Sequence, residues 1–64
     1  MTYPLGPGDT GSRIAMAKVK LGIPPYTEEW TEDLTYRIRG FQALRGMEVT
    51  GLLEPEVLEA LESM

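Results

Sequence analysis

The apolar positions of the chain recur mostly at the spacing of an α-helix. Leu34, Ile38 and Phe41 follow one another at intervals of four and three residues, which places them on one helical face. Two further stripes have the same character, one made of Ile14, Ala17 and Leu21 and one of Val57, Leu58 and Leu61. The pattern predicts an all-α fold, a compact three-helix bundle with short loops, whose helices span about 12–21, 31–45 and 55–62.

Glycine and proline separate these helices. Residues 1–11 are rich in both and are expected to form an irregular N-terminal arm. Gly22 and Gly46 follow the first two stripes and predict left-handed helix ends, while Pro55 fits the first position of the third helix. Gly40 lies inside the second helix, where it either allows a neighbouring backbone to approach or is merely tolerated.

Polar residues at the helix starts are candidate caps. Asp9 or Ser12 is expected to cap the first helix, and Thr31 the second, by accepting hydrogen bonds from free amide groups. Lys18 lies near the C-terminal end of the first helix, where the helix dipole favours positive charge. Met16 and Val19 fall off the apolar stripe of the same helix and are therefore expected outside the core.

The composition indicates one small acidic domain, residues 1–64. With no cysteine, packing alone must stabilise the fold, and a net stability of only a few kcal/mol is expected. The net charge is −4, and residues 46–64 contain five glutamates but no lysine or arginine. This balance disfavours nucleic acid as a partner. The acidic segment is either a solvated helix face or a docking patch for a basic partner.

The chain shows no address for secretion or membranes. The N-terminus lacks the basic start and apolar stretch of a signal peptide, and no segment approaches the roughly 20 apolar residues of a membrane span. We therefore expect a soluble protein, cytoplasmic on synthesis and without a membrane partner. The start at Met1 favours a complete small gene product.

Catalysis is not expected. The sequence contains no histidine and no cysteine, so the commonest general base, metal ligand and thiol nucleophile are missing. Adjacent carboxylates occur at 28–29 and 32–33, but a chain this short is not expected to build a cleft that places two carboxyls in different environments. We predict no catalytic residue, no metal site and no cofactor.

Three motifs in order resemble the peptidoglycan-binding-like domain, a three-helix module attached to many bacterial and phage cell-wall hydrolases. The first is Gly8-Asp9-Thr10-Gly11, followed by the first apolar stripe. The second is an aromatic residue, Trp30, before a helix that closes in Phe41-Gln42. The third runs from Gly46 through Thr50-Gly51 to Glu54-Pro55 and Leu61. The resemblance covers about residues 5–61.

This resemblance implies a non-catalytic module that binds bacterial cell-wall peptidoglycan, through either the glycan strand or the stem peptide. The residues expected to bind the ligand are Tyr26, Trp30, Arg37, Gln42 and Arg45. The aromatic rings offer flat apolar surfaces, and the arginines can pair with a carboxylate. Each residue has a structural alternative: Trp30 as a lid over Leu34, the arginines as solvated side chains, and Gln42 as a helix-to-loop hydrogen-bonding group.

Members of this family usually accompany a catalytic domain, and these 64 residues contain none. The alternative is a small accessory protein of a phage virion, a decoration or minor capsid protein that reuses the fold for contacts with other virion proteins. Its docking residues would be the apolar side chains outside the predicted core, namely Tyr3, Met16, Val19 and Tyr36. The protein would then act either at the cell wall after release or as part of a phage particle.

Overall fold

The computed structural model describes residues 4–64 and has the predicted all-α, three-helix architecture. The helices are α1 (Ser12–Leu21), α2 (Glu32–Leu44) and α3 (Pro55–Glu62). The bounds of α1 and α3 match the expected ones. Helix α2 is one residue shorter at each end than predicted, because Thr31 and Arg45 occupy its cap positions.

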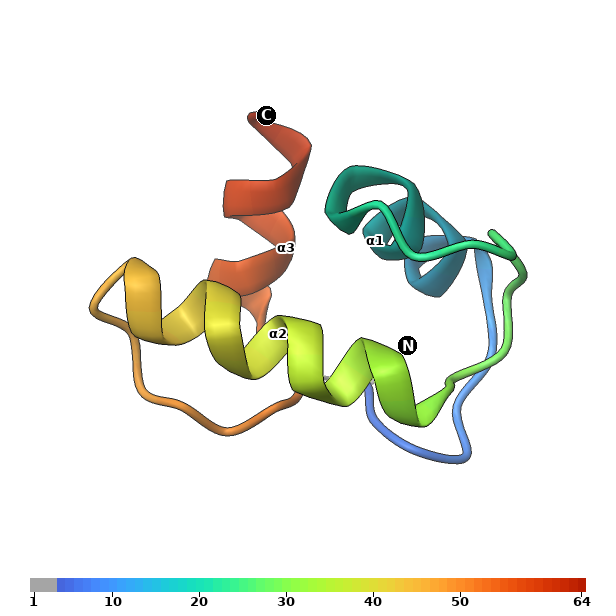
Figure 1. Cartoon of the computed structure of the whole chain (residues 1–64), viewed down its shortest axis with the longest axis horizontal. Coiled ribbons are helices and arrows are strands. Elements are labelled where there is room, and N and C mark those ends of the chain that lie inside the picture. The colour runs from blue at the N-terminus through green and yellow to red at the C-terminus, as the bar shows by residue number, and fades with distance from the viewer. Residues whose placement is uncertain (1–3) are drawn as a thin grey trace.

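Helices α1 and α3 lie against each other on the same side of α2 (Figure 1). The connector between α2 and α3 runs back under α2 before α3 rises to the C-terminus (Figure 1). The hydrophobic core fills the space between the three helices and consists of Leu5, Ile14, Ala17, Ile23, Leu34, Ile38, Leu53, Val57, Leu58 and Leu61.

The predicted apolar stripes account for most of this core. Two of their members, Leu21 and Phe41, are only half-buried at its edge. As expected, Met16 is not among the buried core residues, but its side chain is half-buried and packs against the core cluster. In a bundle of three short helices, α1 is covered on more than the single stripe that the sequence pattern defines.

The described part of the N-terminal arm contains no helix or strand, and it is bound to the rest of the domain. Leu5 is buried, and its backbone pairs with that of Leu53 through two hydrogen bonds of 3.2 and 2.9 Å. Gly6 lies so close to the connector that an added Cβ would stand 2.8 Å from Leu52 Cδ2. The arm therefore closes one end of the core.

The predicted helix caps are corrected by the structure. Gly11 occupies the cap position of α1, and no side chain caps that helix. The carboxylate of Asp9 instead accepts a hydrogen bond from the backbone N–H of Gly6 at 2.7 Å, inside the arm. Thr31 has the expected position at the start of α2 but makes no capping hydrogen bond with its side chain.

The predicted left-handed ends of α1 and α2 are confirmed. Gly22 has φ 72° and Gly46 has φ 70°, values that favour glycine. The backbone N–H of Ile23 donates to Lys18 O at 2.9 Å, and that of Met47 donates to Gln42 O at 2.8 Å. These bonds turn the chain back sharply after each helix.

Gln42 connects α2 to the connector that follows it. Its side chain is fully buried, and Oε1 accepts hydrogen bonds from the backbone N–H groups of Thr50 at 3.0 Å and Gly51 at 2.9 Å. Its Nε2 donates to Thr50 Oγ1 at 3.1 Å. Gly51 has φ 76°, and a Cβ there would press on Arg39 and Thr35 at 3.2 Å. One side chain thus provides the hydrogen-bond acceptor for the backbone N–H groups of the tight turn before α3.

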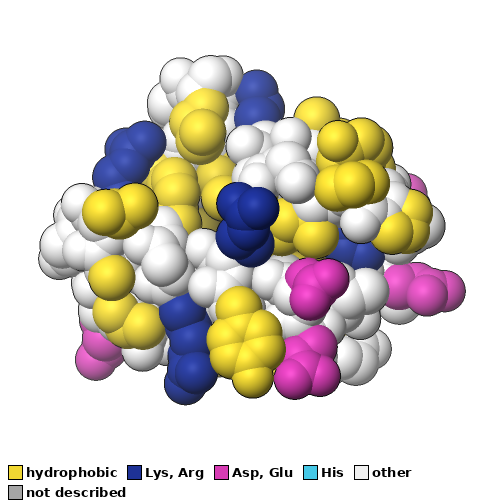
Figure 2. Space-filling model, in the orientation of Figure 1, with side chains coloured by type: hydrophobic (Ala, Val, Ile, Leu, Met, Phe, Trp, Pro, Cys, Tyr) yellow, Lys and Arg dark blue, Asp and Glu magenta, His cyan; other side chains and the backbone are white. Residues whose placement is uncertain are grey.

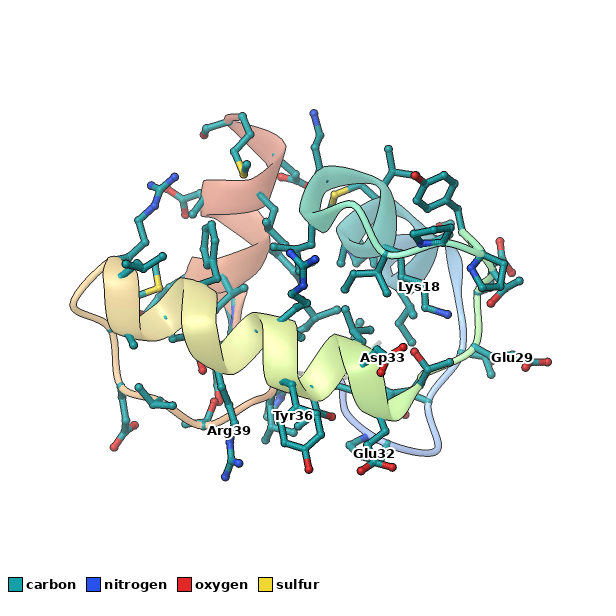
Figure 3. All side chains as sticks on the ribbon, viewed as in Figure 1. Lys18, Glu29, Glu32, Asp33, Tyr36 and Arg39 are labelled. Carbon is teal, nitrogen blue, oxygen red and sulfur yellow. The ribbon has the colours of Figure 1, made fainter. Side chains whose placement is uncertain are left out.

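Lys18 is the feature of α1 that the sequence did not indicate. Its side chain is only 1% exposed, and Nζ donates a hydrogen bond to Thr27 Oγ1 at 2.9 Å (Figure 3). A buried ammonium group is costly unless its surroundings compensate for lost hydration. Lys18 therefore joins α1 to the loop before α2 at an energetic cost.

We expect Gln42→Leu to lower the free energy of unfolding by about 2 to 4 kcal/mol, because it leaves the N–H groups of Thr50 and Gly51 without their acceptor. Urea unfolding followed by circular dichroism measures the change. Glu48→Gln, an exposed substitution in the same connector, is the control and should shift stability by less than about 0.5 kcal/mol. Equal stability of the two variants would contradict the structural role of Gln42.

Two substitutions of Lys18 should separate the contribution of its packing to stability from that of its charge. Lys18→Met keeps an unbranched chain and removes the buried charge, so we expect stability to stay level or rise by up to about 2 kcal/mol. Lys18→Ala should lose about 2 to 3 kcal/mol, since several buried methylenes are deleted. The same urea titration applies, and a Lys18→Met variant as unstable as Lys18→Ala would show that the ammonium group is net stabilising.

Candidate functional site

A shallow groove lies between the C-terminal end of α1 and the exposed side of α2. It has a volume of about 370 Å³, and we call it the loop groove; it is lined by Gly22, Ile23, Pro24, Asp33, Tyr36 and Arg37. The left-handed turn at Gly22 and the buried side chain of Ile23 fix the loop wall. The other wall is α2, where spacings of three and four residues place the last three side chains on one face.

The loop groove combines a carboxylate, a guanidinium and an aromatic ring. Tyr36 is 59% exposed, and its hydroxyl donates to Glu32 Oε1 at 3.4 Å, a long hydrogen bond that leaves the ring accessible. Arg37 Nη1 donates to Leu21 O at 3.3 Å, which holds the guanidinium beside the end of α1. Asp33 and Tyr36 both project from α2 (Figure 3). The groove can therefore contact a ligand that carries both charged and apolar groups.

Tyr26 and Trp30 differ in how far they are accessible. Tyr26 is 53% exposed on the loop before α2. Trp30 is half-buried, packs against the core and donates a hydrogen bond from Nε1 to Thr35 Oγ1 at 2.8 Å. These contacts support the alternative in which Trp30 is a lid over the core. The side chain remains partly exposed, whereas Nε1, its polar atom, already donates to Thr35.

The remaining predicted ligand residues do not meet in the loop groove. Gln42 is fully buried and bonded to the connector, which confirms its helix-to-loop alternative. Arg45 lies over the ring of Phe41, with its Cζ 4.8 Å from the ring centroid. Arg45 also borders a separate groove of about 480 Å³ beside α3. Of the five predicted ligand residues, only Arg37 lines the loop groove. Tyr26 is exposed and follows Pro24 of the groove by two residues in the chain. Trp30, Gln42 and Arg45 do not line the groove.

The predicted protein-contact residues are also separated. Val19 and Tyr36 are exposed, as expected from their positions off the apolar stripes. Met16 packs against the core and offers little surface. Tyr3 lies outside the residues that the structure describes.

Two exposed residues of α2, Asp33 and Leu44, were not predicted from the sequence as ligand or contact residues. The sequence drew attention to Asp33 only as half of the carboxylate pair at 32–33, although its spacing of four residues from Arg37 indicates a shared face. Leu44 is 90% exposed at the end of α2. Helical phase was the available signal, because at 100° per residue Leu44 lies about 90° from the centre of the stripe formed by Leu34, Ile38 and Phe41.

The described residues, 4–64, show neither a metal-site cluster nor a membrane-spanning helix. Within them, no group of three or more acidic, histidine or cysteine side chains is placed to hold a metal ion. No helix in this range combines the length and the apolar character needed to cross a membrane.

Comparison with other proteins gives no match: no family model, no curated protein and no solved structure is similar enough to identify the chain. The likeness to the peptidoglycan-binding-like domain therefore depends on the motifs themselves and on what these residues do in the fold.

The different burial of the two aromatic residues leads to a prediction. Trp30→Ala should lower the free energy of unfolding by about 2 to 4 kcal/mol, below the cost at a fully buried site, because the ring is half-buried. Tyr26→Ala should change it by less than about 0.5 kcal/mol. Thermal unfolding followed by circular dichroism compares them. Equal losses would mean that Tyr26 packs more tightly than its exposure indicates.

Proposed function

We propose that the chain is a non-catalytic binding module for bacterial cell-wall peptidoglycan. The observation that supports this proposal most is the bonding of Gln42 to Thr50 and Gly51. Gln42 belongs to the second family-like motif, and Thr50 and Gly51 belong to the third. Thr50 and Gly51 follow Gln42 in the chain by eight and nine residues. Their direct contact gives a physical reason for the motifs to occur together in one fold.

The first family-like motif also has a structural role. Asp9 accepts the hydrogen bond from Gly6 that shapes the arm, and the N–H of Gly11 donates to Glu28 O at 3.0 Å. The first and third motifs therefore lie at turns, and Gln42 of the second motif, inside α2, bonds to the turn of the third. This use of the motif residues supports the family resemblance in fold, and the cell-wall function is inferred from that resemblance.

The loop groove is the part of the surface that best suits such a ligand. Peptidoglycan stem peptides carry carboxylates, which a guanidinium such as that of Arg37 can bind through paired hydrogen bonds. Tyr36 offers an exposed ring on which a sugar or an alkyl side chain can pack. Asp33 can accept hydrogen bonds from an amine or amide of the same ligand.

The virion accessory role is the second candidate. It is supported by the exposed apolar side chains of Val19, Tyr36 and Leu44, which a partner protein could cover. Specific retention of the purified protein by virus particles from the same source would favour this role over cell-wall binding.

Co-sedimentation with washed, insoluble peptidoglycan sacculi tests the cell-wall proposal. At micromolar concentrations the wild-type protein should pellet with the sacculi. Arg37→Ala should weaken binding by about tenfold or more, the effect of losing one charged hydrogen bond of about 1.5 to 3 kcal/mol. Arg37→Ala, and the control variant described next, should retain the wild-type helical circular dichroism.

Arg39→Ala is the matched control, because it removes the same charge from α2 at a position outside the loop groove. Its binding should stay within about twofold of the wild type. Equal losses in the two variants would indicate attraction by overall charge and would contradict a site at the loop groove. Wild-type protein that remains in the supernatant would contradict cell-wall binding itself.

A further inference from the structure

Asp33 and Arg37 are neighbours on α2 that do not pair with each other. An acid four residues before a base on a helix is within reach of it and commonly forms an ion pair with it. Here Arg37 Nη1 donates instead to Leu21 O at 3.3 Å. Within residues 4–64, no hydrogen bond or ion pair engages the carboxylate of Asp33. The loop groove therefore presents its two opposite charges separately.

The contact with α1 holds the guanidinium of Arg37 and leaves most of its donors available. Leu21 is the last residue of α1, and its carbonyl group is one of those that a helix leaves without an internal partner. In the described part of the chain, this single bond is the only one that Arg37 makes. A guanidinium has several N–H groups in one plane, so the others can bind a carboxylate in the paired geometry.

The two charges of the loop groove select for a ligand that carries both. Figure 2 shows acidic, basic and hydrophobic side chains together on the face along α2. Asp33 and Arg37 are the charged residues that line the groove, so its net charge is zero. A ligand with only a carboxylate meets Arg37 but is repelled by Asp33, and a ligand with only an ammonium group has the opposite conflict. A zwitterion satisfies both side chains.

The size and the apolar part of the groove suit an amino-acid side chain. Its volume of about 370 Å³ lies near the lower end of the range of about 300 to 1,000 Å³ for small-molecule sites. Tyr36 and Pro24 both line it, and Tyr36 is 59% exposed. A short methylene chain attached to the zwitterionic group can lie against these rings.

We propose that the loop groove binds the zwitterionic end of a diaminopimelate side chain in a peptidoglycan stem peptide. This end carries an ammonium group and a carboxylate on the same carbon atom. The ammonium group donates to Asp33, the carboxylate accepts from Arg37, and the methylene chain packs on Tyr36. The inference rests on the proposed cell-wall function and names the part of the polymer that the groove contacts.

Other parts of peptidoglycan lack this combination of charges. A lysine residue at the same place in the stem ends in an ammonium group alone, and the acetylated sugars of the glycan strand carry no ammonium group. Cross-linking of stems converts the diaminopimelate amine to an amide, which has no charge to offer to Asp33. The groove therefore favours stems that contain diaminopimelate and are not cross-linked.

NMR titration of the isotope-labelled chain with soluble stem peptides tests the proposal. The tripeptide of alanine, γ-linked glutamate and meso-diaminopimelate should shift the amide signals of the loop groove, with a dissociation constant on the order of 0.1 to 1 mM. The same tripeptide with lysine lacks only the carboxylate at the side-chain end and should bind at least roughly tenfold more weakly. Equal binding of the two tripeptides would overturn the proposal.

Asp33→Asn tests the contact with the ammonium group. It should weaken binding of the diaminopimelate tripeptide by roughly fivefold to tenfold, but should not weaken binding of the same peptide with its side-chain amine acetylated. Glu29→Gln removes the same charge at an exposed residue outside the groove and should leave both affinities within about twofold. The amide spectrum shows whether each variant keeps the fold. Equal losses in the two variants, or for the two peptides, would contradict the contact.

Free glycine distinguishes the stem peptide from a free amino acid as the source of the zwitterion. It carries the same two charges without the methylene chain and should bind at least roughly tenfold more weakly than the tripeptide. Binding as tight as that of the tripeptide would assign the groove to free amino acids and overturn the stem-peptide ligand.

Sacculi of two compositions separate this inference from the proposed function. The chain should pellet more strongly with sacculi whose stems contain diaminopimelate than with those whose stems contain lysine. Equal retention by both would leave cell-wall binding in place and overturn the diaminopimelate specificity. Retention by neither would contradict cell-wall binding itself, whereas the soluble tripeptides would still decide which ligand the groove takes.

Discussion

The arrangement of this domain depends on the hydrogen bonds between Gln42 and the Thr50–Gly51 turn. The turn bends the chain under α2 and starts α3 in the direction that buries its apolar face. Because the amide groups of the turn are removed from water, they need an acceptor inside the protein. One carboxamide provides it and also bonds to the hydroxyl of Thr50. Without it, the N–H groups of Thr50 and Gly51 would be left without their acceptor.

The rest of the stability comes from a small core closed at its edges by segments outside the helices. The pairing of Leu5 with Leu53 joins the arm to the connector, and Trp30 covers the loop side. Lys18 extends along the core to Thr27 and provides apolar length at the cost of a buried charge. A chain of 64 residues buries only a limited part of its surface between its helices, so these peripheral contacts contribute much of its stability.

Helix α2 presents two different surfaces to solvent beside one another. Toward its N-terminal end, Asp33, Tyr36 and Arg37 face the loop after α1 and offer polar and aromatic groups to a ligand. Toward its C-terminal end, Gly40 and Leu44 form an apolar surface with little polar chemistry. The first surface is the one on which the proposed ligand contact depends, and the second is an exposed apolar patch.

The sequence by itself determined the helices and their apolar faces, because helical periodicity, left-handed glycines and the proline at the start of α3 act locally. It also offered Arg37 as a candidate ligand residue, which the structure places in the loop groove. It named the helix-to-loop alternative for Gln42, although it could not choose between that role and ligand binding. Only the tertiary structure decided the burial of Met16 and Lys18, the use of Asp9 within the arm, and the separation of Arg45 from the loop groove. It also left Leu44 exposed. These outcomes depend on which segments meet in space, and residues far apart in the chain settle that together through packing and shared hydrogen bonds.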